Sequence, residues 1–562
     1  MLWKRCNYEA KGEIEFLLPA LAEAIYGSFY RAENETFMSL TTKKIFWLEI
    51  QMGITSFYFL CFFAAILIVY YLIPGRLQWL LLLVCSVAYY LLGGNGMLIL
   101  YPVASVTACF LGIRLLAVTP GEAQRRRKGI LLMTILVNIG ILVVLKYVNF
   151  GIYTIDGIAK LFGSSKTLIR SVDFLIPLGV SFYTFSLLGY VIDVYYGIAE
   201  PQGNYLKLML YGMYFPVIIS GPILKYREHG EQFFAPHAFD YHRVARGLQR
   251  MLWGFFKKLV IAERLGTMVD TVYGSYMAYP GAYIWFATVC YAFQLYTDFS
   301  GCMDIVLGMS ESLGIILPEN FQTPFFAKSV AEYWRRWHIT LGVWMKEYVF
   351  YPVLRTGFFT NLNRSWKEKF GKKKGKQYAT FAAMFLLWLT VGIWHGGDWK
   401  FVIGSGLLHW VYIVSEELLA PVCGRLMSKC GIREAGRGVG LVRILRTFLL
   451  VCIGDLFFRA ASVGDAFAML RQAVSVWNLA ILWNGDLFGL GLEWIEVLIA
   501  ALSLLLLLAV SLLQQKGSVR DKIGGWALPV RWLIWYALLF AVILLGCYGP
   551  GYSAGEFIYQ GF

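Results

Sequence analysis

The apolar run "MGITSFYFLCFFAAILIVYYLIP", residues 52–74, contains no charged side chain. An α-helix rises about 1.5 Å per residue, so about 20 apolar residues cross the roughly 30 Å hydrocarbon core of a bilayer. The run therefore predicts a membrane-spanning helix. Residues 1–51 contain several glutamates and no comparable run, and we expect them to be an interfacial extension or the product of an upstream start codon.

Similar runs recur along the 562-residue chain, which is 58% hydrophobic and 15% charged. Soluble domains carry about 25% charged residues, so an all-α, polytopic membrane protein with about eleven to thirteen spans is predicted. We divide it into the extension at 1–51, a core at 52–420 and C-terminal transmembrane helices at 421–562. The predicted spans are 53–73, 78–94, 97–117, 129–149, 174–196, 205–224, 283–297, 301–317, 378–395, 399–418, 440–460, 492–514 and 530–548.

Some of these segments are marginal as spans. The pair 283–297 and 301–317 is short and broken by glycine, and the region 338–354 is amphipathic. Segments of this kind often lie in the membrane interface or line a cavity. We therefore expect interfacial and re-entrant helices in addition to the spans.

Basic residues cluster in short loops between the apolar runs, as in "RRRK" at 125–128 and "RSWKEKFGKKKGKQ" at 364–377. Cytoplasmic loops carry such an excess of Lys and Arg. The net charge of +15 thus indicates loop orientation, and no nucleic-acid partner is expected. With these loops inside the cell, the run 378–395 leads outward and places His395 toward the outer half of the membrane. The ten cysteines include no CxxC pair, so neither a metal site nor a disulfide framework is predicted.

Two of the six histidines stand in aromatic sequence at membrane depth. His338 lies in "EYWRRWHITLGVWMKEYVFYPV" (332–353), and His395 lies in "VGIWHGGDWK" (391–400). Ionisable side chains at this depth are costly and usually face a cavity or a partner. A neutral imidazole can take a proton from a hydroxyl group and leave it nucleophilic. We interpret both histidines as functional, and His409, alone on its apolar face, as a satisfied core residue.

The residues after His395 allow two interpretations. Gly396 and Gly397 would let a substrate approach the backbone closely. Asp398 would either orient His395 or cap the helix that begins at Trp399, and its position after two glycines favours the cap.

Acidic residues are frequent in "FQLYTDFSGCMDIVLGMSESLGIILPENFQTPFF" (293–326), which includes Asp298 and Asn320. Acids in marginal spans indicate a lined cavity, whereas an ordinary re-entrant turn is the simpler alternative. Asp193 lies near the end of another apolar run, "IPLGVSFYTFSLLGYVIDVYYG" (176–197). No GxSxG elbow or P-loop motif accompanies these residues, so neither a serine hydrolase nor a P-loop NTPase is indicated.

Six sequence blocks in a fixed order resemble a known family. They include "ENFQTPFFAKSVAEYWRRWHITLGVWMKEYVFYPV" and "GIWHGGDWKFVIGSGLLHW", preceded by "IPLGVSFYTF", "YVIDVYYG", "SGPILKY" and "FQLYTDFSGCMDIVLG". Together they resemble the membrane-bound O-acyltransferase family, in the bacterial branch of alginate O-acetylation and teichoic acid D-alanylation proteins. "GDLFFRAASVGDAFAML" (454–470) is similar to the C-terminal segment of the alginate type.

The resemblance implies a ring of helices around a central funnel, through which an acyl group passes from a cytoplasmic thioester donor to an outside acceptor. It implies that His395 is catalytic and that His338 is the second catalytic histidine. The donor would be an acyl-CoA or an acyl carrier protein, with no bound cofactor and no metal. Further residues that we expect along the substrate tunnel are Trp394, Trp337, Arg335, Asp298, Asn320 and Asp193.

The expected function is transfer of an acyl group, most simply acetyl, to hydroxyls of an exported cell-surface polysaccharide at the bacterial plasma membrane. The alginate-like tail favours acetyl over D-alanyl transfer to teichoic acid. Expected partners are membrane lipid, the donor or carrier protein, the polysaccharide and a separate extracytoplasmic acyltransferase. The alternatives from other classes are a transporter for a polysaccharide or lipid-linked substrate and a scaffold subunit without catalysis.

Overall fold

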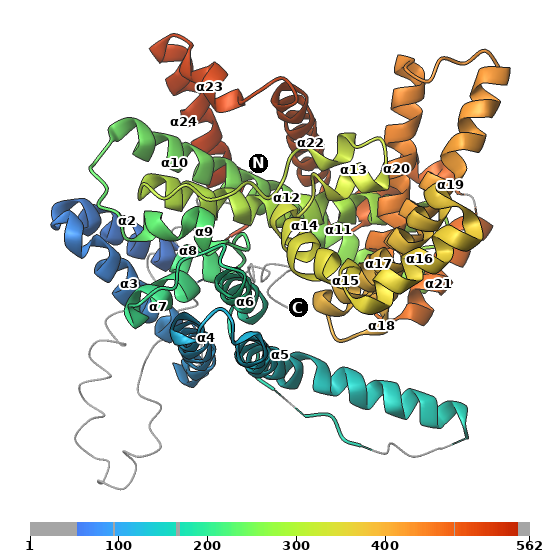
Figure 1. Ribbon diagram of the computed structural model, residues 1–562. Coiled ribbons are helices and arrows are strands. Elements are labelled where there is room, and N and C mark those ends of the chain that lie inside the picture. The colour runs from blue at the N-terminus through green and yellow to red at the C-terminus, as the bar shows by residue number, and fades with distance from the viewer. Residues whose placement is uncertain (1–52, 94–95, 164–168, 173, 477, 549–562) are drawn as a thin grey trace, which may run out of the picture. The chain divides into compact units, whose positions relative to one another are not determined.

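The computed structural model describes residues 53–93, 96–163, 169–172, 174–476 and 478–548, drawn as ribbon in Figure 1. The predicted extension at residues 1–51 lies outside these ranges. Within them every regular element is a helix, and extended pairing is limited to an isolated antiparallel bridge between Phe321 and Trp337. The all-α prediction is confirmed.

The first helices form a group in which α4, α5 and α6 pack against one another. Ser56 begins this group as an N-cap, because its hydroxyl accepts a bond of 3.1 Å from the Phe59 amide. α5 is the long helix that extends along the lower edge of Figure 1. The helices are α2 (Phe57–Leu72), α3 (Gln78–Leu92), α4 (Leu100–Val118), α5 (Gln124–Leu161), α6 (Val180–Tyr195), α7 (Tyr205–Met213), α8 (Phe215–Ile218) and α9 (Tyr226–His229).

Two helices in close contact lie at the centre of the described chain. α12 (Ala282–Ser312) packs along α10 (Tyr241–Phe255), and glycines on both helices make the approach possible. A β-carbon on Gly254 would lie 2.6 Å from the Gly301 carbonyl oxygen, and one on Gly308 would overlap the backbone of α10. After α10 the chain continues through a π-helical segment, Phe256–Ala262, into α11 (Glu263–Gly274).

The next part of the chain contains the predicted catalytic residues. α19 and α20 form an antiparallel hairpin, visible at the upper right of Figure 1. Two π-helical segments, Lys346–Phe350 and Val402–Leu407, interrupt the α-helices here. The α-helices are α13 (Val330–Trp334), α14 (Ile339–Met345), α15 (Tyr351–Leu354), α16 (Gly357–Phe370), α17 (Lys372–His395), α18 (Trp399–Phe401), α19 (Leu408–Lys429) and α20 (Arg437–Arg459).

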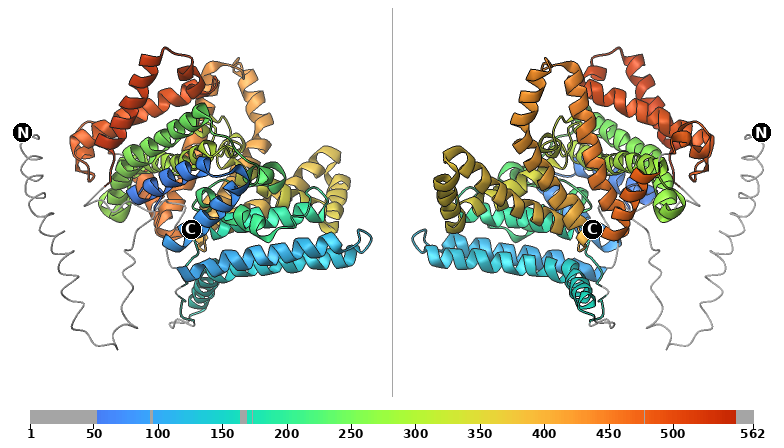
Figure 2. Two further views of the ribbon diagram at one scale, coloured as in Figure 1. Left: turned by 90° about the vertical axis from the view of Figure 1, so that its left-hand side faces the viewer. Right: turned by 90° about the vertical axis from the view of Figure 1, so that its right-hand side faces the viewer.

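Four helices complete the described chain. Of these, α22 and α24 pack against the π-helical segment Phe256–Ala262, and Figure 2 shows them in red and dark orange from two sides. Their bounds are α21 (Val463–Ser475), α22 (Trp494–Gln514), α23 (Val519–Gly524) and α24 (Leu528–Leu545).

Seven helical stretches of the described chain are long and apolar enough to cross a membrane, and each corresponds to one predicted span. Two further predicted spans correspond to the shorter apolar helices Phe57–Leu72 and Val180–Tyr195. This is a multi-pass membrane protein. The arrangement of helices in a ring around a funnel stays a prediction. The seven stretches are Gly75–Leu92, Gly96–Val118, Gln124–Leu161, Lys372–His395, Trp399–Lys429, Trp494–Gln514 and Leu528–Leu545.

The four remaining predicted spans differ from the structure. Residues 283–297 and 301–317 do not form two short spans, because α12 continues through the glycines that pack against α10. The run 205–224 is divided between α7 and α8, where Pro216 lies in the first turn of the second helix. The run 440–460 is helical in α20 but too polar to count among the seven apolar stretches.

Substitution of Gly308 by Val should separate α10 from α12 and destabilise the protein. Forcing extra atoms into such a contact costs about 1–3 kcal/mol, and occasionally more. Gly140→Val on α5 is the matched control, because nothing lies within 4 Å of a β-carbon there. The measurement is the temperature at which detergent-solubilised protein loses its monodisperse peak in size-exclusion chromatography. Equal transition temperatures for the two variants would contradict the predicted close contact.

Candidate functional site

His395 is the last residue of α17 and is only 2% exposed. Its ring contacts Trp394 and Phe458, with ring centroids 5.1 and 5.6 Å away. The predicted catalytic imidazole therefore lies at the end of an apolar membrane-length helix, enclosed by aromatic side chains.

Glycines bring the neighbouring chain against the end of α17. A β-carbon on Gly392 would lie 2.8 Å from the α-carbon of Val402, and one on Gly406 would lie 2.7 Å from the Trp388 carbonyl oxygen. The backbones of α17 and of the segment Val402–Leu407 therefore touch. π-Helical segments such as this one occur frequently at functional sites.

His338 is held by Asn320 in an unusual backbone conformation. Its φ of 46° and ψ of 52° lie in the left-handed region, which side chains other than glycine adopt rarely and at a cost of about 1–3 kcal/mol. The Asn320 amide oxygen lies 3.2 Å from Nδ1 of His338 and accepts bonds of 3.0 Å from both the amide and the hydroxyl of Thr340. Because an amide oxygen only accepts, Nδ1 of His338 carries the proton and Nε2 has the lone pair.

Trp394 contacts both histidines. Its ring centroid is 5.7 Å from that of His338 and 5.1 Å from that of His395. Phe182 and Phe185 of α6 cover other edges of the indole. The structure thus brings the two predicted catalytic histidines together around one indole, although 57 sequence positions separate 338 from 395.

A cavity of about 20 Å³ lies beside His395. Since one water-sized probe occupies about 10–15 Å³, this space is too small for an acyl chain or a sugar, and the site is closed in this conformation. Its polar walls come from three segments: α17, the Val402–Leu407 segment with the start of α19, and α20. The polar lining residues are His395, Ser405, His409 and Asp455, and the aromatic ones are Tyr333, Trp334, Trp337 and Phe458.

The residues after His395 are structural. Asp398 caps the following helix, because its side chain accepts a bond of 3.0 Å from the Lys400 amide. The cap interpretation of Asp398 is therefore confirmed. The proposal that Gly396 and Gly397 leave room for substrate is wrong, since the Phe401 ring covers Gly396 and the Lys146 carbonyl lies 2.7 Å from a β-carbon on Gly397.

Lys146 of α5 is a site residue that the sequence analysis missed. Its ammonium group donates a bond of 2.7 Å to the Trp394 carbonyl and lies 5.7 Å from the centroid of the Trp394 indole. A lysine within the predicted span 129–149 was an available signal, because charged residues in spans are rare and usually functional.

A second and much larger cavity, of about 1010 Å³, reaches Asn320 from the side of α22 and α24. Its apolar wall consists of residues on those two helices, and its polar wall carries ion pairs. Arg250 bonds Asp304 at 2.9 Å, and Lys257 lies 2.7 Å from the other oxygen of Asp304. Further charged residues in the lining are Glu319, Arg336 and Arg520.

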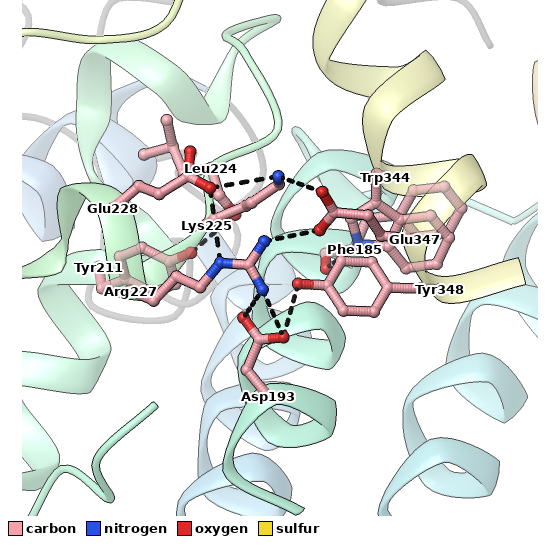
Figure 3. Close-up of polar contacts among 10 residues, drawn as sticks. All are labelled: Phe185, Asp193, Tyr211, Leu224, Lys225, Arg227, Glu228, Trp344, Glu347 and Tyr348. Atoms are coloured by element: carbon pink, nitrogen blue, oxygen red, sulfur yellow. Dashed lines mark hydrogen bonds and ion pairs between the residues drawn. The ribbon is translucent and has the colours of Figure 1, made fainter. Parts of the chain in front are cut away.

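Asp193 belongs to a separate polar network, shown in Figure 3. Arg227 donates to Asp193 at 3.2 Å and to Glu347 at 2.7 Å, and Tyr348 donates to Asp193 at 2.9 Å. Lys225 completes the network with a bond of 2.8 Å to Glu347. Burial raises the pKa of Glu347, but the bonds from Lys225 and Arg227 lower it more, so this pKa lies below its ordinary value.

The other predicted tunnel residues occupy different positions. Trp337 lines the small cavity, and Asn320 lines the large one. Asp298 on α12 is ion-paired with Lys258 at 2.5 Å, and its side chain lines neither cavity. Arg335 is exposed and also lines neither cavity, whereas its neighbour Arg336 lines the large one.

Comparison with known proteins identifies relatives of this chain. Residues 202–458 match MBOAT, the membrane-bound O-acyltransferase family, and this region contains His338, His395 and the whole lining of the small cavity. The chain is 30% identical over 424 residues to the probable alginate O-acetylase of Pseudomonas aeruginosa, covering 75% of each protein.

Two other relatives act on different polymers according to their names. The chain is 26% identical over 375 residues to the peptidoglycan O-acetyltransferase of Helicobacter pylori, covering 62% of this chain and 64% of that protein. It is 27% identical over 292 residues to the teichoic acid D-alanyltransferase of Bacillus subtilis, covering 50% of this chain and 68% of that protein.

Replacement of Asn320 by Leu should destabilise the protein, because buried donors of His338 and Thr340 would lose their acceptor. Each unsatisfied buried donor costs about 1–3 kcal/mol. Thermal unfolding of the purified protein measures the effect, and Asn361→Leu on the exposed face of α16 is the control. If Asn320→Leu and Asn361→Leu unfold at the same temperature, Asn320 does not hold His338.

The network of Figure 3 should make stability depend on pH. Because the pKa of Glu347 is lowered in the folded protein, its stabilising contribution is present above the ordinary glutamate pKa of about 4.3 and is lost as the pH falls through the folded value. The unfolding temperature of the wild type should therefore fall more between about pH 7 and pH 4 than that of Glu347→Gln. Glu368→Gln on α16, an exposed position, should behave like the wild type. A Glu347→Gln profile parallel to the wild type would contradict the prediction.

Proposed function

The chain belongs to the membrane-bound O-acyltransferase family, and on this premise we propose that it moves acetyl groups from a cytoplasmic thioester donor to hydroxyls of an exported cell-surface polysaccharide. That it is an O-acyltransferase follows from the family and from its O-acetyltransferase relatives. The thioester donor, the acetyl group and the polysaccharide acceptor are our proposals.

One observation carries the proposal: His395 lies in an enclosed cavity at the end of a membrane-length helix, and Trp394 contacts both His395 and His338. Acyl transfer to a hydroxyl needs a base and stabilisation of the oxyanion. An imidazole in an enclosed site supplies the base, and enclosure strengthens the electrostatic interactions that act on the developing charge.

The transfer step balances without a further reactant. His395 takes the proton from the acceptor hydroxyl, and the acceptor oxygen bonds to the thioester carbonyl carbon. The carbon–sulfur bond then breaks, and the proton on His395 passes to the departing thiolate. The products are an O-acetyl ester and a free thiol. His338, which Asn320 holds through Nδ1 and whose Nε2 has the lone pair, is the second imidazole that we assign to this reaction.

The large cavity supports a route for the donor. Its lining includes residues of α10, α12, α22 and α24, and also Asn320, the residue that holds His338. Its apolar wall suits an extended thioester arm. The loop 516–522, one of the predicted cytoplasmic loops, contributes to the lining, which agrees with entry from the cytoplasm.

The choice of acetyl rests on the relatives. The alignment with the Pseudomonas aeruginosa alginate O-acetylase covers 75% of this chain, whereas that with the Bacillus subtilis D-alanyltransferase covers 50%. An O-acetylated exopolysaccharide at the bacterial plasma membrane is therefore favoured over D-alanylated teichoic acid. A separate extracytoplasmic acyltransferase would complete the transfer to polymer outside the membrane.

His395→Ala should abolish acylation of the surface polymer, because general base catalysis contributes about 100- to 10,000-fold to such reactions. Cells that lack the chromosomal gene are complemented with wild type, His395→Ala or His242→Ala, the last being an exposed histidine at the start of α10. Mass analysis of the polymer identifies the acyl group, and immunoblotting of membranes confirms equal amounts of protein.

The rival classes give different outcomes. A scaffold without catalysis leaves polymer acylation intact in His395→Ala cells. A transporter changes the amount of exported polymer without changing acyl groups per sugar. D-Alanine in place of acetate on the polymer would support the teichoic acid alternative. The proposed reaction is supported only if the polymer of His395→Ala cells loses acetate while the polymers of wild-type and His242→Ala cells keep it.

A further inference from the structure

Asp455 on α20 presents a carboxyl group to the same small cavity as His395. Within the part of the chain that the structure describes, no hydrogen bond or ion pair includes this carboxyl group. The other carboxylates in apolar surroundings differ in this respect, since Asp193 and Asp304 both accept bonds from arginine. A carboxyl group without such a partner in a small enclosed cavity is costly unless neighbouring groups compensate it.

His409 is the third titratable group in this cavity, and its protonation follows from one contact. The Trp334 indole donates a bond of 3.2 Å to Nδ1 of His409. Because an indole N–H only donates, Nδ1 must accept, and the proton of the neutral ring is on Nε2. Nδ1 of His409 is therefore satisfied, as expected for a core residue, whereas Nε2 is a donor at the cavity wall.

Nε2 of His409 lies beside the backbone of α20. A β-carbon on Gly454 would lie 2.9 Å from Nε2 of His409 and 3.4 Å from the Gly404 carbonyl oxygen. Only a glycine allows the imidazole to lie this close to the helix backbone. The next residue on α20 is Asp455, which lines the same cavity as His409.

We infer that Asp455 is a positioning residue for the acyl transfer: its carboxylate, which shares the small cavity with Nε2 of His409, stabilises the positive charge that His395 acquires on taking the acceptor proton. The inference rests on the proposed function, because it assigns a role in that reaction. Asp455 acts through the two imidazoles and does not itself touch substrate.

The charge balance of the cavity gives the physical reason. When His395 becomes an imidazolium, an apolar enclosure penalises the new charge strongly. A carboxylate across a cavity of about 20 Å³ attracts that charge with little solvent screening.

The test uses inside-out membrane vesicles of the native host, in which wild type or a variant replaces the chromosomal copy. Vesicles receive ¹⁴C-acetyl-CoA, and label transferred to polymer is counted at increasing donor concentration. The variants are Asp455→Asn, Asp455→Glu, His409→Gln and Asp455→Asn with His409→Gln. The control is Asp465→Asn, a half-buried carboxylate on α21 that accepts a bond from Tyr276 and does not line the small cavity. Rates are divided by the amount of monodisperse protein in size-exclusion chromatography.

Asp455→Asn should lower the saturating rate by roughly 10- to 100-fold and leave the half-saturating donor concentration unchanged. This is less than the roughly 10,000-fold cost of removing a carboxylate bonded directly to a catalytic imidazole. Asp455→Glu should restore most of the rate, and the double variant should be no slower than the slower single variant.

Three outcomes would overturn the inference. A folded Asp455→Asn protein with the wild-type rate shows that the carboxylate has no role. Equal losses in Asp455→Asn and Asp455→Glu, with multiplied losses in the double variant, indicate packing alone. Wild-type vesicles that transfer no label overturn the proposed function itself, and the role of Asp455 falls with it.

Discussion

Contact between backbones at glycine residues determines how the buried imidazoles are placed. Helices in lipid gain little from hydrophobic association, so close packing at small residues replaces it. Gly392 and Gly406 bring α17 against the Val402–Leu407 segment, and Gly404 and Gly454 bring that segment and His409 against α20. Three stretches of chain thereby meet around one small cavity, and each contributes a group that can gain or lose a proton. Larger side chains at these glycines would push the three stretches of chain apart. The titratable groups would then be too far from one another to exchange a proton.

The other buried charges serve a different purpose. Asp193 is bonded to Arg227, Asp298 to Lys258, and Asp304 to both Arg250 and Lys257. Removing one member of such a buried pair typically costs about 3–5 kcal/mol, because it leaves the other charge uncompensated. These pairs join helices to one another. The cavity beside His395 instead contains imidazoles and a carboxyl group that no ion pair includes among the described residues.

The sequence was sufficient for the helical class and for the seven apolar stretches, and it singled out two histidines that both contact Trp394, because each leaves a local signal. Apolar length marks a span, and an imidazole in such a run is conspicuous. From the sequence, Asp298 and Asp193 are expected along a tunnel. In the sequence alone, an acid in an apolar run looks the same whether its side chain lines a cavity or pairs with a cation. Lys258, the partner of Asp298, is distant from it in sequence. Arg227, the partner of Asp193, comes from another segment. The glycines of α12 were likewise interpreted as breaks in a helix. Their role in close packing becomes visible only when the neighbouring helix, α10, is known.

Trp394 limits how protons move within this site. Its indole contacts both His338 and His395, and an indole nitrogen has a hydrogen to give but no lone pair with which to receive one. A proton therefore cannot be relayed through the indole from one imidazole to the other. Any exchange of protons between the two rings has to bypass the side chain that packs against both.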